Sequence, residues 1–178
     1  SVKDPNGVYT YYTYNGDNGL VTSVSSAGST VNYTYDSTYT RLNSVNHNGF
    51  NYNFTYDGFG NTVQTKVGNT PLMTNSYAAA NGPLQMSIYG NGDIVSYTYD
   101  NTGRVTDKNN NAAAYSWTYS GSGVPNSYTD NVSGKKYLYT YDSLGRLIYQ
   151  SGKNISDNNN QSSNVYKYDI SNNLTQIT

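Results

Sequence analysis

Short stretches in which aromatic and polar residues alternate recur along the whole chain. In Tyr97-Thr98-Tyr99 the two aromatic residues lie two positions apart, and Tyr139-Thr140-Tyr141 has the same spacing. Residues two apart on a β-strand point to the same face, so each stretch predicts a strand with one aromatic and one polar face. Residues that favour turns, mainly Asp, Asn and Gly, follow most of these stretches. The pattern therefore predicts a series of strands separated by turns.

These stretches form a repeat when they are aligned on their second aromatic position. The fourth phrase is "YAAA", in which Tyr77 takes the first position and Ala79 the second. The second positions are then spaced by 21, 21, 23, 20, 20, 22 and 27 residues, and lie at Tyr14, Tyr35, Tyr56, Ala79, Tyr99, Tyr119, Tyr141 and Tyr168. Seven of the eight phrases keep the aromatic-x-Tyr pattern, and five continue with aspartate. A repeat of this regularity indicates an architecture built from one structural unit.

One period of the repeat predicts one β-hairpin. Asp100 begins a four-residue turn that ends at Gly103, where glycine tolerates a left-handed backbone. A second extended run follows, then a second turn such as "NHNG" at residues 46–49. Eight hairpins give about sixteen strands, and open sheets rarely exceed ~10 strands without curling. The predicted fold is all-β, with antiparallel hairpins of about 20–22 residues that form one long curved sheet.

The residues of the motif are expected to hold neighbouring repeats together. Equivalent tyrosines of adjacent hairpins should lie next to each other, where cross-strand aromatic pairs contribute ~0.2–1 kcal/mol each. The aspartates should accept hydrogen bonds from the turns, and the arginines after the turns should pair with them. The motif positions are Tyr12, Tyr14, Tyr33, Tyr35, Asp36, Tyr56, Asp57, Gly60, Tyr97, Tyr99, Asp100, Gly103, Arg104, Tyr139, Tyr141, Asp142, Gly145, Arg146, Tyr166, Tyr168 and Asp169.

Composition supports the all-β prediction and argues against nucleic-acid binding, membrane insertion and thiol chemistry. The chain has 178 residues with 22 tyrosines, 27 asparagines, 20 threonines and no glutamate. The net charge is −1 with scattered basic residues, so nothing resembles the basic surface of a nucleic-acid-binding protein. No apolar run reaches the ~20 residues of a membrane-spanning helix, and membrane insertion is not expected. The absence of cysteine excludes disulfides and thiol chemistry.

The phrases "YTYDNTGR", "YTYDSLGR" and "FTYDGFGN" resemble the YD repeat of the Rhs, wall-associated and teneurin proteins. "DPNG" at residues 4–7 and "YGNG" at residues 89–92 are similar to the second turn of that repeat. The resemblance covers essentially the whole chain. It implies a long sheet that spirals into a hollow shell, which encloses a C-terminal toxin in bacterial members and forms part of an adhesion receptor in teneurins.

The chain departs from the regular repeat in three places. "YAAA" loses the second tyrosine and the aspartate, and the turn at residues 37–41 has an extra residue. Residues 151–164 lengthen the last period by about six residues and are predicted to be a flexible insertion. Residues 1–178 are expected to form a single domain of about eight repeats, which starts and stops inside a repeat and is an excised segment of shell wall.

The sequence offers no convincing catalytic, cofactor or metal site. His47 is the only histidine and lies in the predicted turn "NHNG", which favours a plain turn residue. "NGDNG" at residues 15–19 and "SDNNN" at residues 156–160 lack the spacing and the glutamate of a calcium loop. Asp4-Pro5 resembles the aspartate-proline autoproteolytic motif of Rhs shells, but its distance from the next aromatic strand favours a hairpin turn.

The leading hypothesis is a non-catalytic wall segment of a YD-repeat shell from a large secreted or cell-surface protein, bacterial in origin, that encapsulates or delivers a toxin. Its partners would be neighbouring repeats, an enclosed toxin domain and other copies, through open sheet edges. The alternative is a tyrosine-rich module that binds carbohydrate or cell wall, in which a glycan is the partner. Paired tyrosines packed in a ladder favour the first hypothesis, and tyrosines open in grooves favour the second.

Overall fold

A computed structural model describes residues 1–79, 81–157 and 159–178. The chain divides into two compact units, Ser1–Asp93 and Ile94–Thr178. Seventeen strands lie in the described residues, and neighbouring strands within each unit are antiparallel. The all-β class and the repeated hairpins predicted from the sequence are confirmed. Whether residues 1–178 behave as a single domain stays a prediction.

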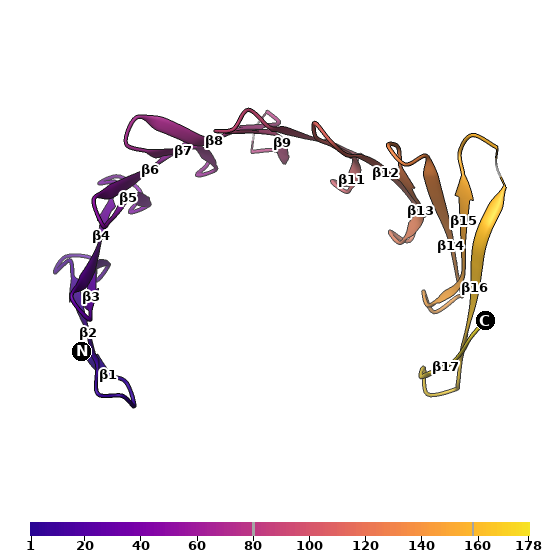
Figure 1. The fold of residues 1–178 in the computed structure, drawn as a ribbon, viewed down its shortest axis with the longest axis horizontal. Coiled ribbons are helices and arrows are strands. Elements are labelled where there is room, and N and C mark those ends of the chain that lie inside the picture. The colour runs from indigo at the N-terminus through magenta and orange to yellow at the C-terminus, as the bar shows by residue number, and fades with distance from the viewer. Residues whose placement is uncertain (80, 158) are drawn as a thin grey trace. The chain divides into compact units, whose positions relative to one another are not determined.

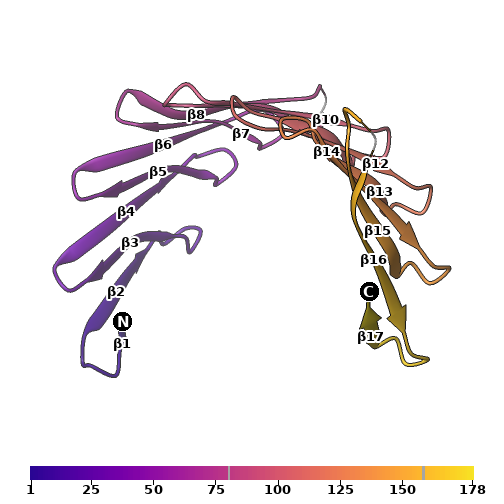
Figure 2. The same ribbon diagram turned by 45° about the vertical axis from the view of Figure 1, so that its right-hand side comes forward.

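The first unit is an open sheet whose strands follow one another in chain order (Figure 1). Its strands are β1 (Val2–Lys3), β2 (Tyr9–Tyr14), β3 (Val21–Ser26), β4 (Ser29–Tyr35), β5 (Leu42–His47), β6 (Phe50–Tyr56), β7 (Thr62–Val67), β8 (Thr70–Tyr77) and β9 (Leu84–Tyr89). The even-numbered strands carry the aromatic phrases and the odd-numbered ones return. Figure 2 shows the turns of this unit at the two opposite sides of the sheet.

The second unit repeats this plan. Its strands are β10 (Ile94–Tyr99), β11 (Val105–Asn109), β12 (Ala114–Tyr119), β13 (Pro125–Asp130), β14 (Lys135–Tyr141), β15 (Leu147–Asn154), β16 (Asn160–Tyr168) and β17 (Leu174–Ile177). Residues 151–154 and 160–164 of the predicted insertion belong to β15 and β16, so the extra residues lengthen that hairpin. Residue 158 lies outside the described residues, and the flexibility of 151–164 stays a prediction.

A β-bulge interrupts every hairpin at its motif tyrosine. In the first hairpin Thr13 pairs with Ser23 and Tyr14 with Val21, which leaves Thr22 as the extra residue of the return strand. A bulge increases the local twist of a strand pair, so one bulge per repeat curls each sheet. The register shifts occur at Tyr14, Tyr35, Tyr56, Tyr77, Tyr99, Tyr119, Tyr141 and Tyr168.

This set corrects the alignment of the fourth repeat. The sequence pattern puts Tyr77 in the first position with Ala79 in the second, and that placement is wrong. Tyr77 takes the second position, Asn75 replaces the first aromatic residue, and Ala78 replaces the aspartate. The error arises because the letters "YAAA" show only one tyrosine, and nothing in them says which position it fills. Residue 80 lies outside the described residues.

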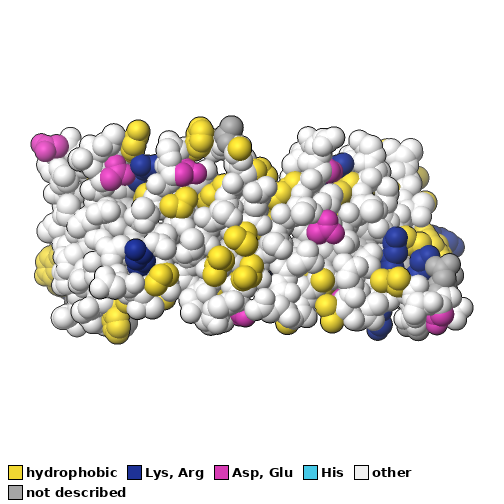
Figure 3. Space-filling view, turned by 90° about the horizontal axis from the view of Figure 1, so that it is seen from above, with side chains coloured by type: hydrophobic (Ala, Val, Ile, Leu, Met, Phe, Trp, Pro, Cys, Tyr) yellow, Lys and Arg dark blue, Asp and Glu magenta, His cyan; other side chains and the backbone are white. Residues whose placement is uncertain are grey.

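Each sheet is a single layer, so the described residues contain no hydrophobic core. The accessible surface of 11388 Å² is about a third larger than the ~8,600 Å² expected for a compact monomer of this mass. Among the described residues, Gly152 and four serines, Ser44, Ser87, Ser127 and Ser151, are buried, and no apolar side chain is fully buried. Figure 3 shows a face on which apolar side chains lie in small separate groups among polar atoms. Stability must therefore come from contacts along the sheet.

The turn at Asp57 contains two glycines, and only one of them has a left-handed backbone. Gly60 has a φ of +94°, whereas Gly58 does not have a positive φ and an added Cβ would meet open space. A left-handed backbone costs a residue with a Cβ ~1–2 kcal/mol. We therefore expect Gly60→Ala to lower the free energy of unfolding by about that amount and Gly58→Ala to leave it unchanged, as measured by urea unfolding. Equal effects of the two changes would contradict a requirement for glycine at position 60 alone.

Candidate functional site

The junction between one repeat and the next is the most regular feature of the molecule. The phenol of Tyr35 donates a hydrogen bond to the Val21 carbonyl oxygen, 14 residues earlier, at 2.9 Å. Val21 is the first residue of the preceding return strand. Four more tyrosines do the same, at 2.7–3.0 Å: Tyr56 to Leu42, Tyr77 to Thr62, Tyr119 to Val105 and Tyr168 to Leu147. A phenylalanine would leave these carbonyl groups without this partner.

The motif aspartates close the turns that precede five of the return strands, after Asp36, Asp57, Asp100, Asp142 and Asp169. Asp142 Oδ1 accepts hydrogen bonds from the amides of Leu144 and Arg146, and Gly145 N–H donates to the Asp142 carbonyl. Asp57 and Asp169 accept equivalent bonds, with asparagine in place of arginine at the fourth position after the aspartate. Several amide and side-chain donors converge on each of these carboxylates, so they are occupied as structural acceptors.

The arginines extend this turn to the following repeat. Arg104 Nε donates to Asp100 Oδ2 at 2.6 Å, and its Nη1 donates to the Ser120 carbonyl in the next turn at 3.2 Å. The same guanidinium lies 4.6 Å from the ring centroid of Tyr119, whose phenol bonds back to Val105. Arg41 and Arg146 repeat the arrangement with Tyr56 and Tyr168. Each of these half-buried ion pairs contributes ~0–1 kcal/mol, and together they fix how each turn lies against the next.

Hydrogen bonds keep the turn carboxylates ionised. The amide of Arg146 contributes most to holding the pKa of Asp142 below its ordinary value. The side-chain amide of Asn173 does the same for the pKa of Asp169. Burial raises the pKa of Asp100, but the hydrogen bonds from Thr102 and Arg104 outweigh it, and the pKa lies well below the ordinary value. Such carboxylates are poor candidates for general acids near neutral pH.

The strand register across the junction is the same in every repeat pair within the two units. The third residue of the return strand, counted with the bulge, pairs with the residue three before the next motif tyrosine. The six pairs are Ser23 with Asn32, Ser44 with Asn53, Gln64 with Thr74, Asp107 with Ser116, Ser127 with Leu138, and Tyr149 with Val165. A constant register repeats each side chain on the same face of the sheet.

Aromatic stacking takes a different form from the one expected. A return strand separates equivalent motif tyrosines, so rings of the same position in adjacent repeats do not stack; Tyr97 and Tyr99 of one phrase lie 6.5 Å apart, and the largest group also uses rings outside the motif. Tyr128 on β13 lies 5.8 Å from Tyr115 on β12 and 5.9 Å from Tyr137 on β14, with interplanar angles near 25°. Trp117 joins this group at 5.6 Å from Tyr128. These four residues, hereafter the aromatic ladder, stack on one another, and Tyr137 also covers Gly152 on β15.

The opposite face of the sheets is joined by small polar side chains. Thr34 and Ser44 share a hydrogen bond of 2.7 Å, and Thr118 and Ser127 share one of 2.8 Å. In each pair the threonine lies between the two aromatic positions of its phrase. Cross-strand pairs of this kind contribute ~0.2–1 kcal/mol each, which explains why serines are buried in a sheet without a core.

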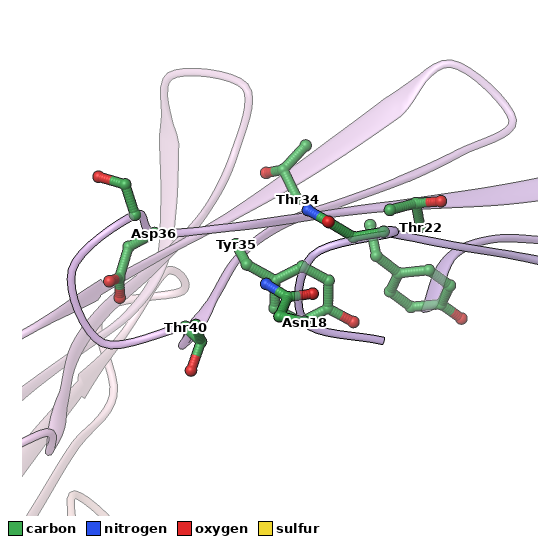
Figure 4. Close-up of a pocket in the computed structure, with 9 residues that line it drawn as sticks. Asn18, Thr22, Thr34, Tyr35, Asp36 and Thr40 are labelled. Atoms are coloured by element: carbon green, nitrogen blue, oxygen red, sulfur yellow. The ribbon is translucent and has the colours of Figure 1, made fainter. Parts of the chain in front are cut away.

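A cavity of about 320 Å³ lies beside the first two turns. Figure 4 shows Tyr35 and Asn18 next to each other on one side of the strand, whereas the side chains of Thr22 and Thr34 point to the other side. The Asp36 carboxylate at its edge is held by Thr38, Tyr39 and Arg41. The cavity therefore offers mainly amides, hydroxyls and tyrosine rings. It is lined by Asn15, Asn18, Thr22, Tyr33, Thr34, Tyr35, Asp36, Ser37 and Thr40.

The other candidate residues have structural positions. His47 ends β5, just before the turn where it was expected, and its Nε2 lies 3.0 Å from Ser29 Oγ. Asp4 closes the turn between β1 and β2, with its carboxylate accepting from the Val8 amide at 2.8 Å. In the part of the chain that the structure describes, no three acidic or histidine side chains group as metal ligands, and no helix is long and apolar enough to cross a membrane.

Sequence reasoning missed three features of the junction. The acceptor of each motif phenol and the reach of each arginine into the next turn depend on the register between repeats, and the bulge at each motif tyrosine depends on the pairing within its own hairpin. The constant spacing of about 21 residues was the available signal, because it requires every repeat to meet its neighbour in the same way.

Comparisons with known proteins agree with this geometry. No family model matches the chain. It is 35% identical over 120 residues to a tRNA3(Ser)-specific nuclease, WapA, of Bacillus spizizenii, a match that covers 65% of this chain and 5% of the nuclease. A crystal structure of TcdB2-TccC3-TEV superimposes with a TM-score of 0.78 at 14% identity, over 98% of this chain and 10% of that one. The structure of the Photorhabdus luminescens Tc holotoxin pore superimposes with a TM-score of 0.67 at 19% identity. This match covers 96% of this chain and 10% of that one. The likeness to the solved structures shows the fold.

The phenol bond can be tested without removing the ring. We expect Tyr119→Phe to lower the free energy of unfolding by ~1 kcal/mol, because the Val105 carbonyl loses its donor. Tyr14→Phe is the matched control, since the Tyr14 phenol makes no hydrogen bond among the described residues. Thermal melts at low protein concentration would compare the two. If both variants melt like the original chain, the junction bond does not contribute.

The turn carboxylates predict a stability loss in acid. Their folded pKa values lie below the unfolded value of ~3.9, so their stabilisation is complete above that pH and is lost as pH falls through the folded values. We expect the melting temperature to be steady from about pH 7 to 5 and to fall below about pH 4. Asp142→Asn should flatten this dependence. A melting temperature that rises between about pH 5 and 3 would contradict the assignment.

Proposed function

We propose that this chain, which has the YD-repeat shell fold, is a length of the wall of a toxin-associated shell and acts as a structural element. The observation that carries the proposal is the constant junction. Phenol, arginine and carboxylate are all used to join one repeat to the next, which is what a wall one layer thick requires.

The shell would enclose or deliver a toxin. The chain spans 5% of the nuclease and about a tenth of the solved chains it matches, so a wall segment fits beside a separate active part. The Bacillus relative is named a nuclease, and one of the solved structures is a Tc holotoxin pore. A single-layer sheet with an aromatic ladder on one face and hydroxyls on the other has two distinct surfaces, one of which would meet a cargo.

The proposed location is outside the cell, in a bacterial protein that is secreted or held at the surface. The cysteine-free sequence suits that environment, because its stability does not depend on the redox state. The partners would be neighbouring repeats and an enclosed toxin domain. The chain itself would not be an enzyme, since its aspartates are held as turn acceptors.

Carbohydrate binding is the second candidate, and the cavity beside Tyr35 favours it. Neutral amides, hydroxyls and an aromatic ring are the groups that bind sugar hydroxyls and sugar faces. The aromatic ladder opposes this candidate, because the faces of its stacked rings contact one another. Only the ring edges are then open to a ligand, whereas a sugar binds to a ring face. A glycan partner would then belong to the cavity and not to the ladder.

Three measurements on the purified chain separate the candidates. As a wall segment it should show no turnover of tRNA, glycoside, ester or peptide substrates and no signal on a glycan array. Tyr128→Ala should destabilise it by roughly 2 kcal/mol, less than a core aromatic residue because the ladder is half-buried. Glycan binding that Asn18→Ala abolishes would favour the second candidate. Turnover that a single aspartate substitution abolishes would overturn the non-catalytic proposal.

A further inference from the structure

The outer edge of β2 carries an unfilled half of a repeat junction. The two-residue strand β1 pairs only with Tyr9 and Thr10, so the outer backbone from Tyr11 to Tyr14 is unpaired. Tyr14 is 59% exposed, and its phenol makes no hydrogen bond in the part of the chain that the structure describes. It holds the position from which five other motif tyrosines donate to a preceding return strand.

The outer edge of β17 carries the other half. Leu174 begins this return strand, as Leu42 and Leu147 begin theirs, and those two carbonyl groups each accept a phenol. Thr178 exchanges both backbone hydrogen bonds with Val165, so by strand alternation the N–H and carbonyl of Ile177 point outward. All four residues of β17 are exposed.

The constant register fits these two edges to each other. Applied to β17 and β2, it places Gln176 opposite Tyr11 and Ile177 opposite Thr10, with the Tyr14 phenol at the Leu174 carbonyl. In the structure Val2 pairs with Thr10, so β17 must displace the two-residue strand β1 from this edge. The four residues of β17 would then pair where two residues of β1 pair now. Both edges are uncharged, so no repulsion opposes the pairing.

We propose that separate copies of a polypeptide of residues 1–178 join head to tail, with β17 of one copy added to the outer edge of β2 of the next. The occupant of each edge is a second copy of this chain, because its free edge presents a return strand whose first carbonyl group is the acceptor that five internal junctions use for the motif phenol. The contact joins two different edges and leaves one of each free on a dimer, so further copies can add to it. The inference goes beyond the wall function, which a monomer could also serve.

Blocking one edge at a time gives the decisive test. Ile177→Pro removes an outward backbone N–H from β17. Tyr12→Pro removes one from β2, because the backbone N–H groups of its neighbours Tyr11 and Thr13 point inward to β3. Proline is tolerated on an edge strand, so both variants should fold. Light scattering after size exclusion would measure mass over a hundredfold range of concentration. The original chain should grow in mass with concentration, and each variant alone should stay monomeric. An equimolar mixture should stop at a heterodimer, because only one complementary pair of edges remains.

Two further variants test the proposal without a proline in β2 or β17, in case the first two variants fail to fold. Tyr14→Phe keeps the ring and should raise the concentration of half-association about fivefold, the factor for one neutral hydrogen bond. Val2→Pro weakens the competing β1 strand and should strengthen association. Thermal melts would confirm that each variant is folded. The proposal is overturned if the original chain is monomeric throughout, if folded Ile177→Pro associates as strongly as the original, or if neither Tyr14→Phe nor Val2→Pro changes association.

Discussion

A hydrogen bond from a tyrosine phenol to a backbone carbonyl 14 residues earlier, as between Tyr119 and Val105, is the interaction on which the rest of the molecule depends. A globular domain buries apolar side chains between layers, whereas the described residues of each unit form a single layer with no fully buried apolar side chain. Order must then come from contacts within the plane of the sheet. The phenol anchors each motif ring over its neighbour's backbone, and the arginine of the preceding turn lies against the face of that ring.

The same constraint accounts for the unusual composition. Tyrosine replaces phenylalanine because its hydroxyl is used, and aspartate replaces glutamate because the shorter side chain reaches the amides of its own turn, as Asp142 does. Threonine between the aromatic positions bonds to serine on the return strand, as Thr34 does to Ser44. Each residue type is repeated because each repeat has the same task. Catalytic chemistry would need some of these groups to be free.

Much of the fold could be predicted because the repeat is local. The spacing in Tyr97-Thr98-Tyr99 defines a strand, and Asp100 with Gly103 defines a turn, without reference to the rest of the chain. The features that escaped prediction are those that two repeats determine together. The position of Tyr77 could not be read from "YAAA", since its partner is the Thr62 carbonyl. Likewise, Gly152 carries no turn signal, and a Cβ there would meet Ser162 Oγ and the ring of Tyr137 on the two neighbouring strands.

The constant register across the junctions has a consequence for how such a chain can change over generations. A duplication or loss of one whole repeat joins a return strand to an aromatic strand in the register that both already use, as Ser44 with Asn53 or Ser127 with Leu138. Every new neighbour is then compatible with every old one. A change of a few residues must instead be absorbed outside the part of the junction that keeps the register, as in the long β15–β16 pair, where Tyr149 still pairs with Val165 and the register shifts only beyond Gly152. The gene can therefore vary the number of its repeats by unequal recombination while the spacing inside each one stays nearly fixed.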